Sequence, residues 1–161
     1  MTEVTNYTFF WTGPFSQWFP AKFVIDDVKY ISTEQYMMAQ KAVLFDDKEA
    51  FKNIMLTHSP RKQKAFGRAV KGFNKNEWEK VARGLVYMGN YAKFTQNPDL
   101  KEFILKTSGT ELVEASPYDK IWGIGLPEGH KDIYDPKKWK GKNWLGQVLT
   151  QVRLKIEEEN V

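Results

Sequence analysis

The sequence predicts a mainly α-helical protein of the α+β class, folded as a single compact domain over residues 1–161 with a small β element near the N-terminus. Three observations support this prediction. Six segments carry a helix start signal or apolar residues at helical spacing. Strand-like stretches are short, and two of them lie before residue 31. No linker, internal repeat or low-complexity segment divides the 161 residues, which are enough to bury a sizeable core.

Two short strands are predicted near the N-terminus. Residues 8–11 and 23–30 are rich in aromatic and β-branched side chains. Asp26 and Asp27 interrupt the second run and can turn it back on itself, so we expect a hairpin there. A further short strand is expected over residues 111–115.

The first three helices are predicted from the residues that would start them. Ser32 can cap a helix over residues 33–45, and Gln35 can complete a capping box with it. A second helix is expected over residues 47–56. Pro60 opens a third helix, since proline costs nothing at the first helical position, and this helix carries Arg61, Lys64 and Arg68.

The second half of the chain continues this pattern. Asn74 can cap a long helix over residues 75–95, and Pro98 starts a short one that runs to about residue 106. The chain closes with an amphipathic helix over residues 144–158. Residues 116–140 form a long loop, and loops of that length are often functional. The expected buried positions are Trp78, Val81, Leu85, Met88 and Ala92 in the long helix, and Leu145, Val148, Val152 and Ile156 in the last.

The composition excludes several kinds of site. The chain contains no cysteine, so it has no disulfide, thiolate metal site or thiol nucleophile. It has two histidines, His58 and His130, which lie far apart in sequence, so we expect no zinc site. The net charge of +4 and the pI near 9.1 suit a phosphate-bearing ligand.

No targeting or membrane segment is apparent in the sequence. Residues 1–6 lack a basic region followed by an apolar run, and no stretch approaches the roughly 18 apolar residues of a membrane span. We therefore expect a soluble, cytoplasmic protein with no membrane partner.

The most informative segment runs from Ser32 to Ala42, with the sequence STEQYMMAQKA. Glu34 falls in the first turn of the expected helix, and Lys41 follows two turns later on the same face, with Met38 between them. A carboxylate and an amine on one partly apolar face can form the floor of an active site. The alternative is structural, because acidic residues in a first turn favour the helix dipole.

Three other segments accompany this helix in a fixed order. They are FSQWFP from Phe15, SPYDKIWGIG from Ser116 and GKNWLG from Gly141. Together with the helix they resemble the NADAR family, also called YbiA-like proteins, from about Phe10 to about Arg153. The resemblance implies the YbiA-like fold and a small hydrolase, free of metal and cofactor, that cleaves the N-glycosidic bond of ribosyl-phosphate conjugates.

The resemblance implies two substrate classes. Some family members act on phosphoribosylamino-pyrimidine intermediates of riboflavin synthesis, and others remove ADP-ribose from guanine bases. The second class implies contact with ADP-ribosylated nucleic acid and a functional pairing with an ADP-ribosyltransferase. Both classes carry a ribose phosphate and a flat base, so the sequence does not separate them. The alternatives are a non-catalytic reader of ADP-ribose or a related nucleotide, and a plain nucleic-acid-binding protein, which the modest charge disfavours.

Three residues are candidates for catalysis. Glu34 is the first choice, as general acid/base or as electrostatic stabiliser of an oxocarbenium-like ribose. Asp119 is the second carboxylate, which the resemblance places in the active site; the alternative is a turn aspartate that bonds its own backbone. Lys41 can bind phosphate, neutralise the transition state, or attack an opened ribose as a Schiff base. Its alternative is an exposed lysine paired with Asp46 or Gln40.

Other residues are candidates for binding the substrate. Trp122 and Trp18 can stack on the leaving base, although aromatic residues are more often core. Lys142 can hold phosphate at the start of the last helix, and Asn143 can bond a ribose hydroxyl or a base edge, or simply cap that helix. Gly123 would let the backbone approach a ligand closely.

Each remaining candidate could have a structural role instead of a role in binding. Asn90 is a possible ligand contact, while its neighbour Gly89 can serve helix packing. Arg61 can reach a phosphate or lie on a solvated face. Gln17 stands where the family usually has asparagine, which puts in doubt any contact carried over to this position.

Overall fold

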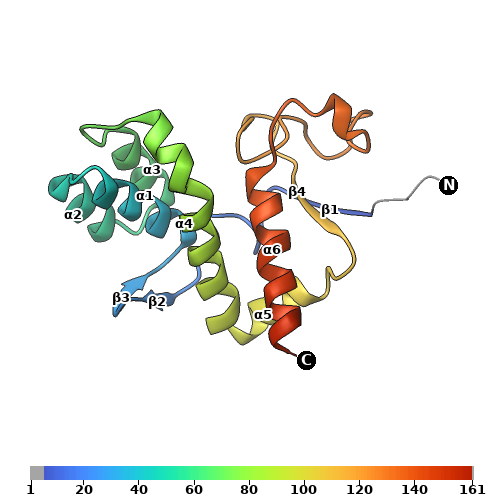
Figure 1. The fold of residues 1–161 in the computed structure, drawn as a ribbon, viewed down its shortest axis with the longest axis horizontal. Helices are drawn as coiled ribbons and strands as arrows, with labels where there is room; N and C mark the ends of the chain where they lie inside the picture. The colour runs from blue at the N-terminus through green and yellow to red at the C-terminus, as the bar shows by residue number, and fades with distance from the viewer. Residues whose placement is uncertain (1–5, 161) are drawn as a thin grey trace. The chain divides into compact units, whose positions relative to one another are not determined.

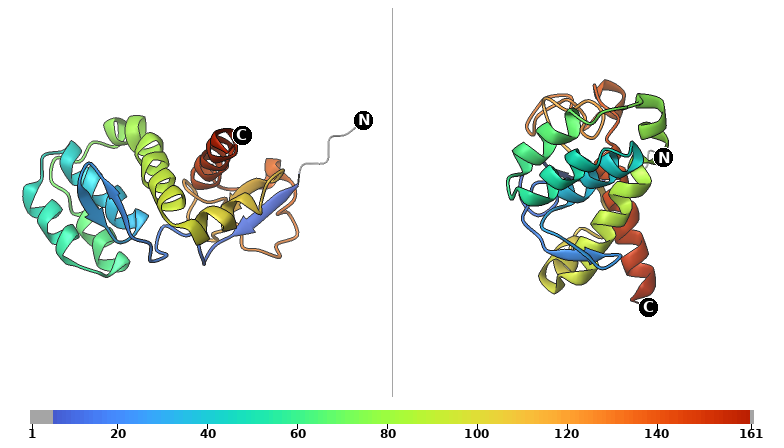
Figure 2. Two further views of the ribbon diagram at one scale, coloured as in Figure 1. Left: turned by 90° about the horizontal axis from the view of Figure 1, so that it is seen from below. Right: turned by 90° about the vertical axis from the view of Figure 1, so that its left-hand side faces the viewer.

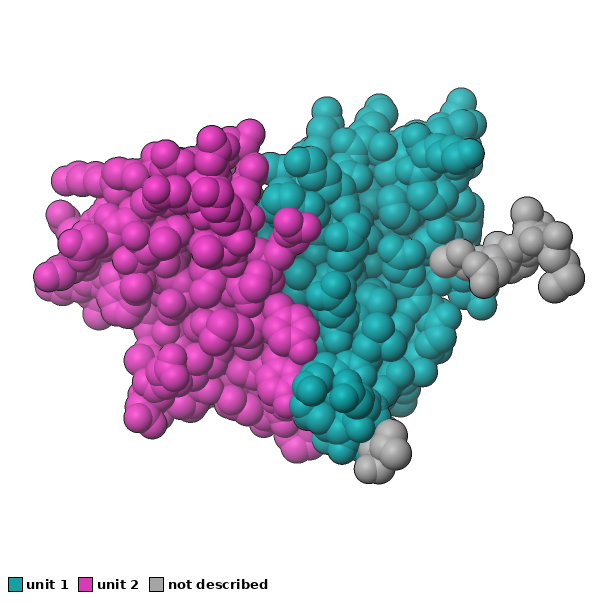
Figure 3. Space-filling view, in the orientation of Figure 1, with its two compact units in different colours: residues 1–16, 99–161 teal, residues 17–98 magenta. Residues whose placement is uncertain are grey.

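The computed structural model describes residues 6–160, in which six α-helices and four short strands are found (Figure 1). This confirms the predicted mainly helical class. The expectation about the N-terminal segment rests on residues 1–6, and residues 1–5 of it lie outside the described part. The chain divides into two compact units: unit 1 holds residues 1–16 and 99–161, and unit 2 holds residues 17–98 (Figure 3). The expectation of one domain over residues 1–161 stays a prediction.

Unit 2 begins with the predicted hairpin. Strand β2 (Phe23–Ile25) pairs antiparallel with β3 (Val28–Tyr30), and Phe23 lies opposite Tyr30. The two-residue turn between them is Asp26-Asp27, and both residues have positive φ angles of 52° and 64°. Such a turn matches the right-handed twist of the two strands, which is why two aspartates suffice to close the hairpin.

Four helices complete unit 2: α1 (Thr33–Leu44), α2 (Lys48–Leu56), α3 (Pro60–Arg68) and α4 (Lys75–Gln96). Each starts where the sequence predicts, because a side-chain oxygen of the preceding residue accepts a hydrogen bond from a free backbone N–H. These capping residues are Ser32, Asp47, Ser59 and Asn74. Helix α1 packs against the other three (Figures 1 and 2), which explains why it is buried along most of its length.

The buried face of α4 differs from the predicted one. Val81 and Met88, expected inside, are exposed, while Ala82, Val86 and Asn90 are buried. Trp78 and Ala92 are buried as predicted. The buried positions repeat every four residues from Trp78 through Asn90. Apolar residues stand on several sides of this helix, so the hydrophobic pattern alone allows more than one buried face.

Unit 1 contains a second two-stranded sheet. Strand β1 (Tyr7–Phe10) pairs in parallel with β4 (Glu111–Glu114), and Tyr7 lies opposite Glu111. The predicted N-terminal β element is therefore two separate sheets, because the first strand joins a partner about 100 residues later rather than the hairpin.

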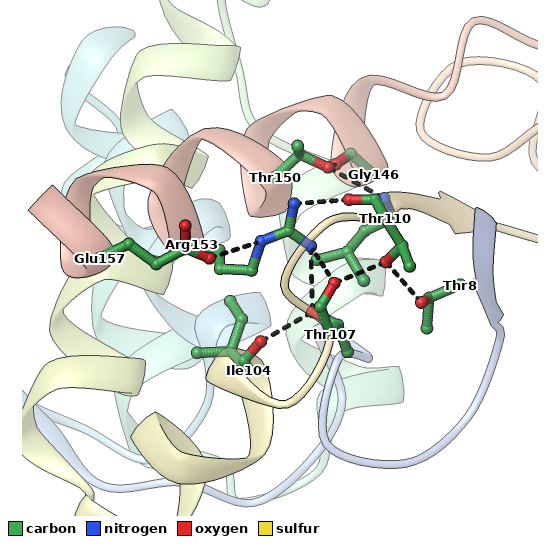
Figure 4. A network of polar contacts seen from close by, with 9 residues as sticks. Thr8, Ile104, Thr107, Thr110, Gly146, Thr150, Arg153 and Glu157 are labelled. Carbon is green, nitrogen blue, oxygen red and sulfur yellow. Dashed lines mark hydrogen bonds and ion pairs between the residues drawn. The ribbon is translucent and has the colours of Figure 1, made fainter. Parts of the chain in front are cut away.

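Two helices follow in this part of the chain: α5 (Pro98–Leu105), which precedes β4, and α6 (Trp144–Glu159), which follows it. Helix α6 packs against β4 and buries all four residues predicted to face inward, namely Leu145, Val148, Val152 and Ile156. Its buried Arg153 donates hydrogen bonds to the carbonyl oxygens of Thr107 and Thr110, and also forms an ion pair with Glu157 at 3.2 Å (Figure 4). These contacts tie α6 to the connection between α5 and β4.

The long segment between β4 and α6 is folded rather than extended. A short 3₁₀ helix, η1 (Pro136–Lys138), lies within it. Ile124, Leu126 and Ile133 pack with Val113 and Ala115 into a small hydrophobic cluster. The loop predicted over residues 116–140 is therefore anchored by its own apolar side chains. Within residues 6–160, every helix is too short or too polar to cross a membrane.

Candidate active site

Unit 2 holds Glu34 in the first turn of α1, where its side chain is buried (6% exposed). The backbone N–H of Glu34 donates to the carbonyl oxygen of Gln17 at 3.0 Å, and the hydroxyl of Thr33 donates to the same oxygen at 3.2 Å. The segment before the hairpin is thus fixed to the start of α1. Glu34 is therefore not a solvated acid on the helix surface. Taking a carboxylate out of water costs free energy.

Lys41 lies on the same helix and is half-buried. Its Nζ is 4.5 Å from the centre of the Phe73 ring and 5.8 Å from that of Trp78. Burial lowers the pKa of Lys41, the negative charge of Glu34 raises it, and the positive charge of Arg68 lowers it further. Glu34 and Lys41 lie seven residues apart in α1, so they share one face of the helix, as their spacing predicts. Lys41 is therefore not an exposed lysine.

Gln17 and Asn90 form a partly buried hydrogen bond near the start of α1. Asn90 is fully buried, and its Nδ2 donates to Oε1 of Gln17 and to the carbonyl oxygen of Val86, both at 2.9 Å. Among the described residues, nothing donates a hydrogen bond to Oδ1 of Asn90. Glutamine at position 17 thus reaches Asn90 with its longer side chain. The predicted ligand contact of Asn90 stays a prediction.

The sequence reasoning missed Lys93, which follows Asn90 by one turn of α4. Its side chain is fully buried (0% exposed), and burial lowers its pKa to about 7. Nζ lies 5.0 Å from the ring centre of Phe94 and 5.7 Å from that of Phe19. Lys93 lies on the face of α4 that also carries Val86 and Gly89, seven and four residues earlier, but a lysine at such a position is ordinarily exposed, so its type concealed its burial.

Three other residues of unit 2 have defined places. A Cβ atom at Gly89 would meet the Tyr36 ring at 2.9 Å, so this glycine serves the packing of α1 on α4. Trp18 is partly exposed (44%). Arg61 is exposed in the first turn of α3, and Arg68 at the other end of that helix is the arginine whose charge acts on Lys41.

Unit 1 holds Asp119 in a tight turn. Its Oδ1 accepts hydrogen bonds from the backbone N–H groups of Ile121 at 2.9 Å and Trp122 at 2.8 Å. The hydroxyl of Ser116 accepts from the N–H groups of Tyr118 and Asp119. Asp119 is therefore a turn aspartate, as the structural alternative proposes. Its second oxygen, Oδ2, takes no part in the turn, so a chemical role for the carboxylate is compatible with this geometry.

The glycines after this turn allow one backbone segment to lie against another. A Cβ atom at Gly123 would lie 3.0 Å from the carbonyl oxygens of Asp119 and Glu114. A Cβ atom at Gly141 would overlap the carbonyl oxygen of Gly123. The close approach expected at Gly123 is thus made to the protein's own backbone. These contacts hold the turn of Asp119 against the segment that precedes α6.

Trp122 and Lys142 meet around a third side chain. The Trp122 ring contacts the Trp144 ring edge to face, with 5.5 Å between their centres. Nζ of the exposed Lys142 lies 5.3 Å from the centre of the Trp144 ring. An exposed ammonium beside one indole ring, which itself contacts a second, is an arrangement that can bind a phosphate and a flat base.

Asn143 has a structural role that the sequence did not reveal. The residue is buried, with a positive φ of 55°, and its side chain makes no cap on α6, contrary to the capping alternative. Instead Oδ1 accepts from the N–H of Glu114 at 2.9 Å, and Nδ2 donates to the carbonyl oxygen of Leu112 at 3.1 Å. The amide therefore pairs with the free edge of β4, which leaves it little capacity for a ligand.

Comparison with known proteins identifies the family of this scaffold. The NADAR domain family matches residues 9–157. An N-glycosidase of Acanthamoeba polyphaga mimivirus is 48% identical over 151 residues, which cover 91% of this chain and 86% of the relative. The chloroplastic riboflavin biosynthesis protein PYRR of Zea mays is 31% identical over 156 residues, covering 89% of this chain and 23% of the relative.

A solved structure supports the same assignment. The NMR structure of the Escherichia coli protein YbiA matches with a TM-score of 0.80 and 27% sequence identity, covering 99% of this chain and 89% of YbiA. The family match spans segments of both units, and the structural match covers nearly every residue of the chain. The chain belongs to the NADAR domain family.

Proposed function

We propose that this protein is an N-glycosidase that hydrolyses the bond between a ribosyl phosphate and a flat nitrogenous base. The observation that carries the proposal is the buried Glu34 with Lys41 on the same face of α1. Glu34 is buried in the first turn of this helix and Lys41 is half-buried in its last turn, and taking such charged groups out of water costs stability, which is why they often mark functional sites. The mimivirus relative, which is named an N-glycosidase and aligns over 91% of this chain, supports the same activity.

The reaction requires few groups. The leaving base takes a proton, the ribose passes through an oxocarbenium-like state, and water completes the hydrolysis. In our proposal Glu34 exchanges the proton or stabilises the positive charge on the ribose. Asp119 is the second carboxylate, acting through Oδ2. Trp122 stacks on the base, and Lys142 binds phosphate.

Lys41 has two possible roles that an experiment separates. As a cation it binds phosphate or offsets charge in the transition state. As a neutral amine it attacks C1 of the ring-opened glycosylamine, in which C1 is joined to the base nitrogen as an imine. The C1–base bond then breaks, the base leaves as its free amine, C1 stays on Nζ as a new imine, and water later hydrolyses that imine to the free sugar. Borohydride reduces an imine to a stable amine, so a covalent sugar adduct on the wild type that is absent from Lys41→Arg assigns the second role. Lys93→Arg belongs in the same experiment, since burial lowers the pKa of Lys93 to about 7.

Two substrate classes fit this proposal. The name of the Zea mays relative favours a phosphoribosylamino-pyrimidine intermediate of riboflavin synthesis. An ADP-ribosylated guanine in nucleic acid is the other class, and an ADP-ribosyltransferase would then be the functional partner. Both carry phosphates, which suit the net charge of +4, and both would be found in the cytoplasm that we propose for this protein.

The test is a base-release assay on both substrates, with the products separated by chromatography. We expect the wild type to release the free base from one of them and to leave an intact ribosyl phosphate. Binding of ADP-ribose without release from either substrate would contradict the proposal and support a non-catalytic reader.

A further inference from the structure

A pocket of about 420 Å³ lies within unit 1, between the end of β1, the segment that follows it, and the end of α5. None of the proposed catalytic residues lines it. This volume falls in the range of small-molecule sites, which are typically lined by apolar and aromatic side chains with a few polar groups.

Five aromatic residues line the pocket. Phe10 and Phe15 are buried with ring centres 5.3 Å apart, and the Phe15 ring also contacts Phe103 at 5.0 Å. Phe103 and Trp11 line the pocket while remaining partly exposed, at 38% and 44%. Buried rings thus support partly exposed ones. An indole and a phenyl ring left open to solvent beside a cavity offer flat faces to a planar ligand.

The polar groups of the pocket have different charges. Lys106 and Glu128 both line it, and both are exposed. Lys106 lies 3.8 Å from Glu102, but both side chains of that pair are 72% exposed, so the ion pair contributes little. The ammonium of Lys106 can therefore turn to an anion such as phosphate. The carboxylate of Glu128 can accept a hydrogen bond from an amino group of a base.

The wall that carries Lys106 is held in place. The next residue, Thr107, accepts hydrogen bonds from Nη1 of Arg153 at its carbonyl oxygen, 2.8 Å away, and at its hydroxyl, 3.1 Å away (Figure 4). Thr8, on the opposite strand, shares a hydrogen bond of 2.6 Å with Thr110. A wall fixed before binding lowers the entropic cost of binding.

We propose that this pocket binds a nucleotide. The base stacks on Trp11 and Phe103, the phosphate contacts Lys106, and Glu128 accepts a hydrogen bond from the base. A purely apolar ligand would leave both charges unused. The same chemistry is presented by a free nucleotide and by one nucleotide of a single-stranded nucleic acid. The proposal requires no hydrolysis. It can therefore be tested independently of the glycosidase proposal.

The test measures binding of a fluorescein-labelled, unmodified single-stranded hexanucleotide by fluorescence anisotropy. Free GMP and AMP are added as competitors, and an abasic hexamer with the same phosphates controls for charge. We expect Trp11→Ala to raise the dissociation constant at least about fivefold, since stacking on one aromatic residue is worth roughly 1–3 kcal/mol. Trp11→Phe should restore most of the affinity, which separates stacking from misfolding.

Two matched controls sharpen this test. Leu154 is an exposed apolar residue of α6 (54%), so Leu154→Ala removes a surface side chain away from the pocket. Lys155 forms an ion pair with Glu159, and Lys106 forms one with Glu102. In each pair the two residues lie four positions apart in the sequence. We therefore expect Lys106→Glu to weaken binding several-fold more than Lys155→Glu, although both change the net charge equally.

The outcomes divide clearly. Competition by GMP or AMP that is lost in Trp11→Ala supports the proposal and assigns free nucleotides as ligands. Binding of the hexamer alone, lost in the same variant, supports it and assigns single-stranded nucleic acid. The proposal is overturned by equal binding of the abasic and intact hexamers, by equal effects of Lys106→Glu and Lys155→Glu, or by no binding to the wild type.

Discussion

At the scale of single residues, the buried face of α4 carries a group that destabilises the folded state. Lys93 is fully enclosed, and burial lowers its pKa from 10.5 to about 7. Above pH 7 the native state holds this amine mostly neutral, while the unfolded chain keeps it protonated up to about pH 10.5. The unfolded state therefore binds more protons in this window, and the free energy of unfolding rises with pH.

The change Lys93→Met removes this pH dependence. Lys93 contributes a rise of up to about 1.4 kcal/mol per pH unit between pH 7 and pH 10, and the variant lacks it. We expect the variant to be more stable than the wild type near pH 6, with the difference shrinking toward pH 10. Urea unfolding at several pH values measures this. Lys80→Met, on an exposed position of α4, is the control, and an identical pH profile in Lys93→Met would contradict the expectation.

Asp119 allows the turn and the chemistry to be separated. Asparagine keeps an oxygen that can accept from the N–H groups of Ile121 and Trp122, but it lacks the negative charge. We expect Asp119→Asn to keep the melting temperature and to lower the rate of base release by about 100-fold or more.

The control for this change is Asp135→Asn. Oδ1 of Asp135 accepts from the N–H of Lys137 at 3.1 Å, which matches the bond that Oδ1 of Asp119 accepts from the residue two positions later in the same loop. This control should release base at the wild-type rate. Equal rates in both variants would show that Asp119 serves only the turn.

At the scale of helices and strands, local signals were sufficient for most elements. Ser32, Asp47 and Asn74 supply capping oxygens, and Pro60 fixes the first turn of α3. Such signals act within four residues of the helix end, so the sequence contains them in full. The hairpin turn at Asp26 and Asp27 is equally local.

Other features depend on residues far apart in the chain. The partner of β1 lies about 100 residues away, and the sequence of neither strand indicates which strand it pairs with. Asn143 stands at a helix start, where asparagine commonly caps the helix. Its side-chain amide instead forms hydrogen bonds with the backbone of Leu112 and Glu114 in β4. The sequence therefore indicated which residues are candidates for the site, but it did not reveal the long-range contacts that hold them in place.

The packing of α6 on β4 can be tested with one methyl group. A Cβ atom at Gly146 would overlap the backbone carbonyl oxygen of Leu112 and the amide of Asn143. Helix and strand would have to separate, so we expect Gly146→Ala to destabilise the protein by about 1–3 kcal/mol.

Gly84→Ala is the matched control for that change. Gly84 also lies inside a helix, but a Cβ atom there meets nothing within 4 Å. Alanine should stabilise α4 by up to about 1 kcal/mol, because it forms helix more readily than glycine. Thermal unfolding of the two variants measures the contrast, and a shift of the same sign in both would refute this account of Gly146.

At the scale of the whole chain, the family match spans segments of both units, whereas the structure establishes the geometry within each. Unit 2 brings together Glu34, Lys41 and the hydrogen bond between Gln17 and Asn90. Unit 1 supplies the turn of Asp119 and the indole rings of Trp122 and Trp144. The central claim is that the buried Glu34 takes part in base release. An exposed acid would stabilise the start of a helix equally well, so stabilising the helix does not explain the burial.

The most direct test of this claim is the single-turnover rate of base release by Glu34→Gln at saturating substrate. Glu49→Gln is the control, since Glu49 is also a first-turn acid but is exposed on α2. We predict a loss of about 100-fold to 10,000-fold for Glu34→Gln, with its melting temperature and substrate affinity retained, and no loss for Glu49→Gln. A Glu34→Gln protein that folds, binds substrate and releases base at the wild-type rate would contradict the account.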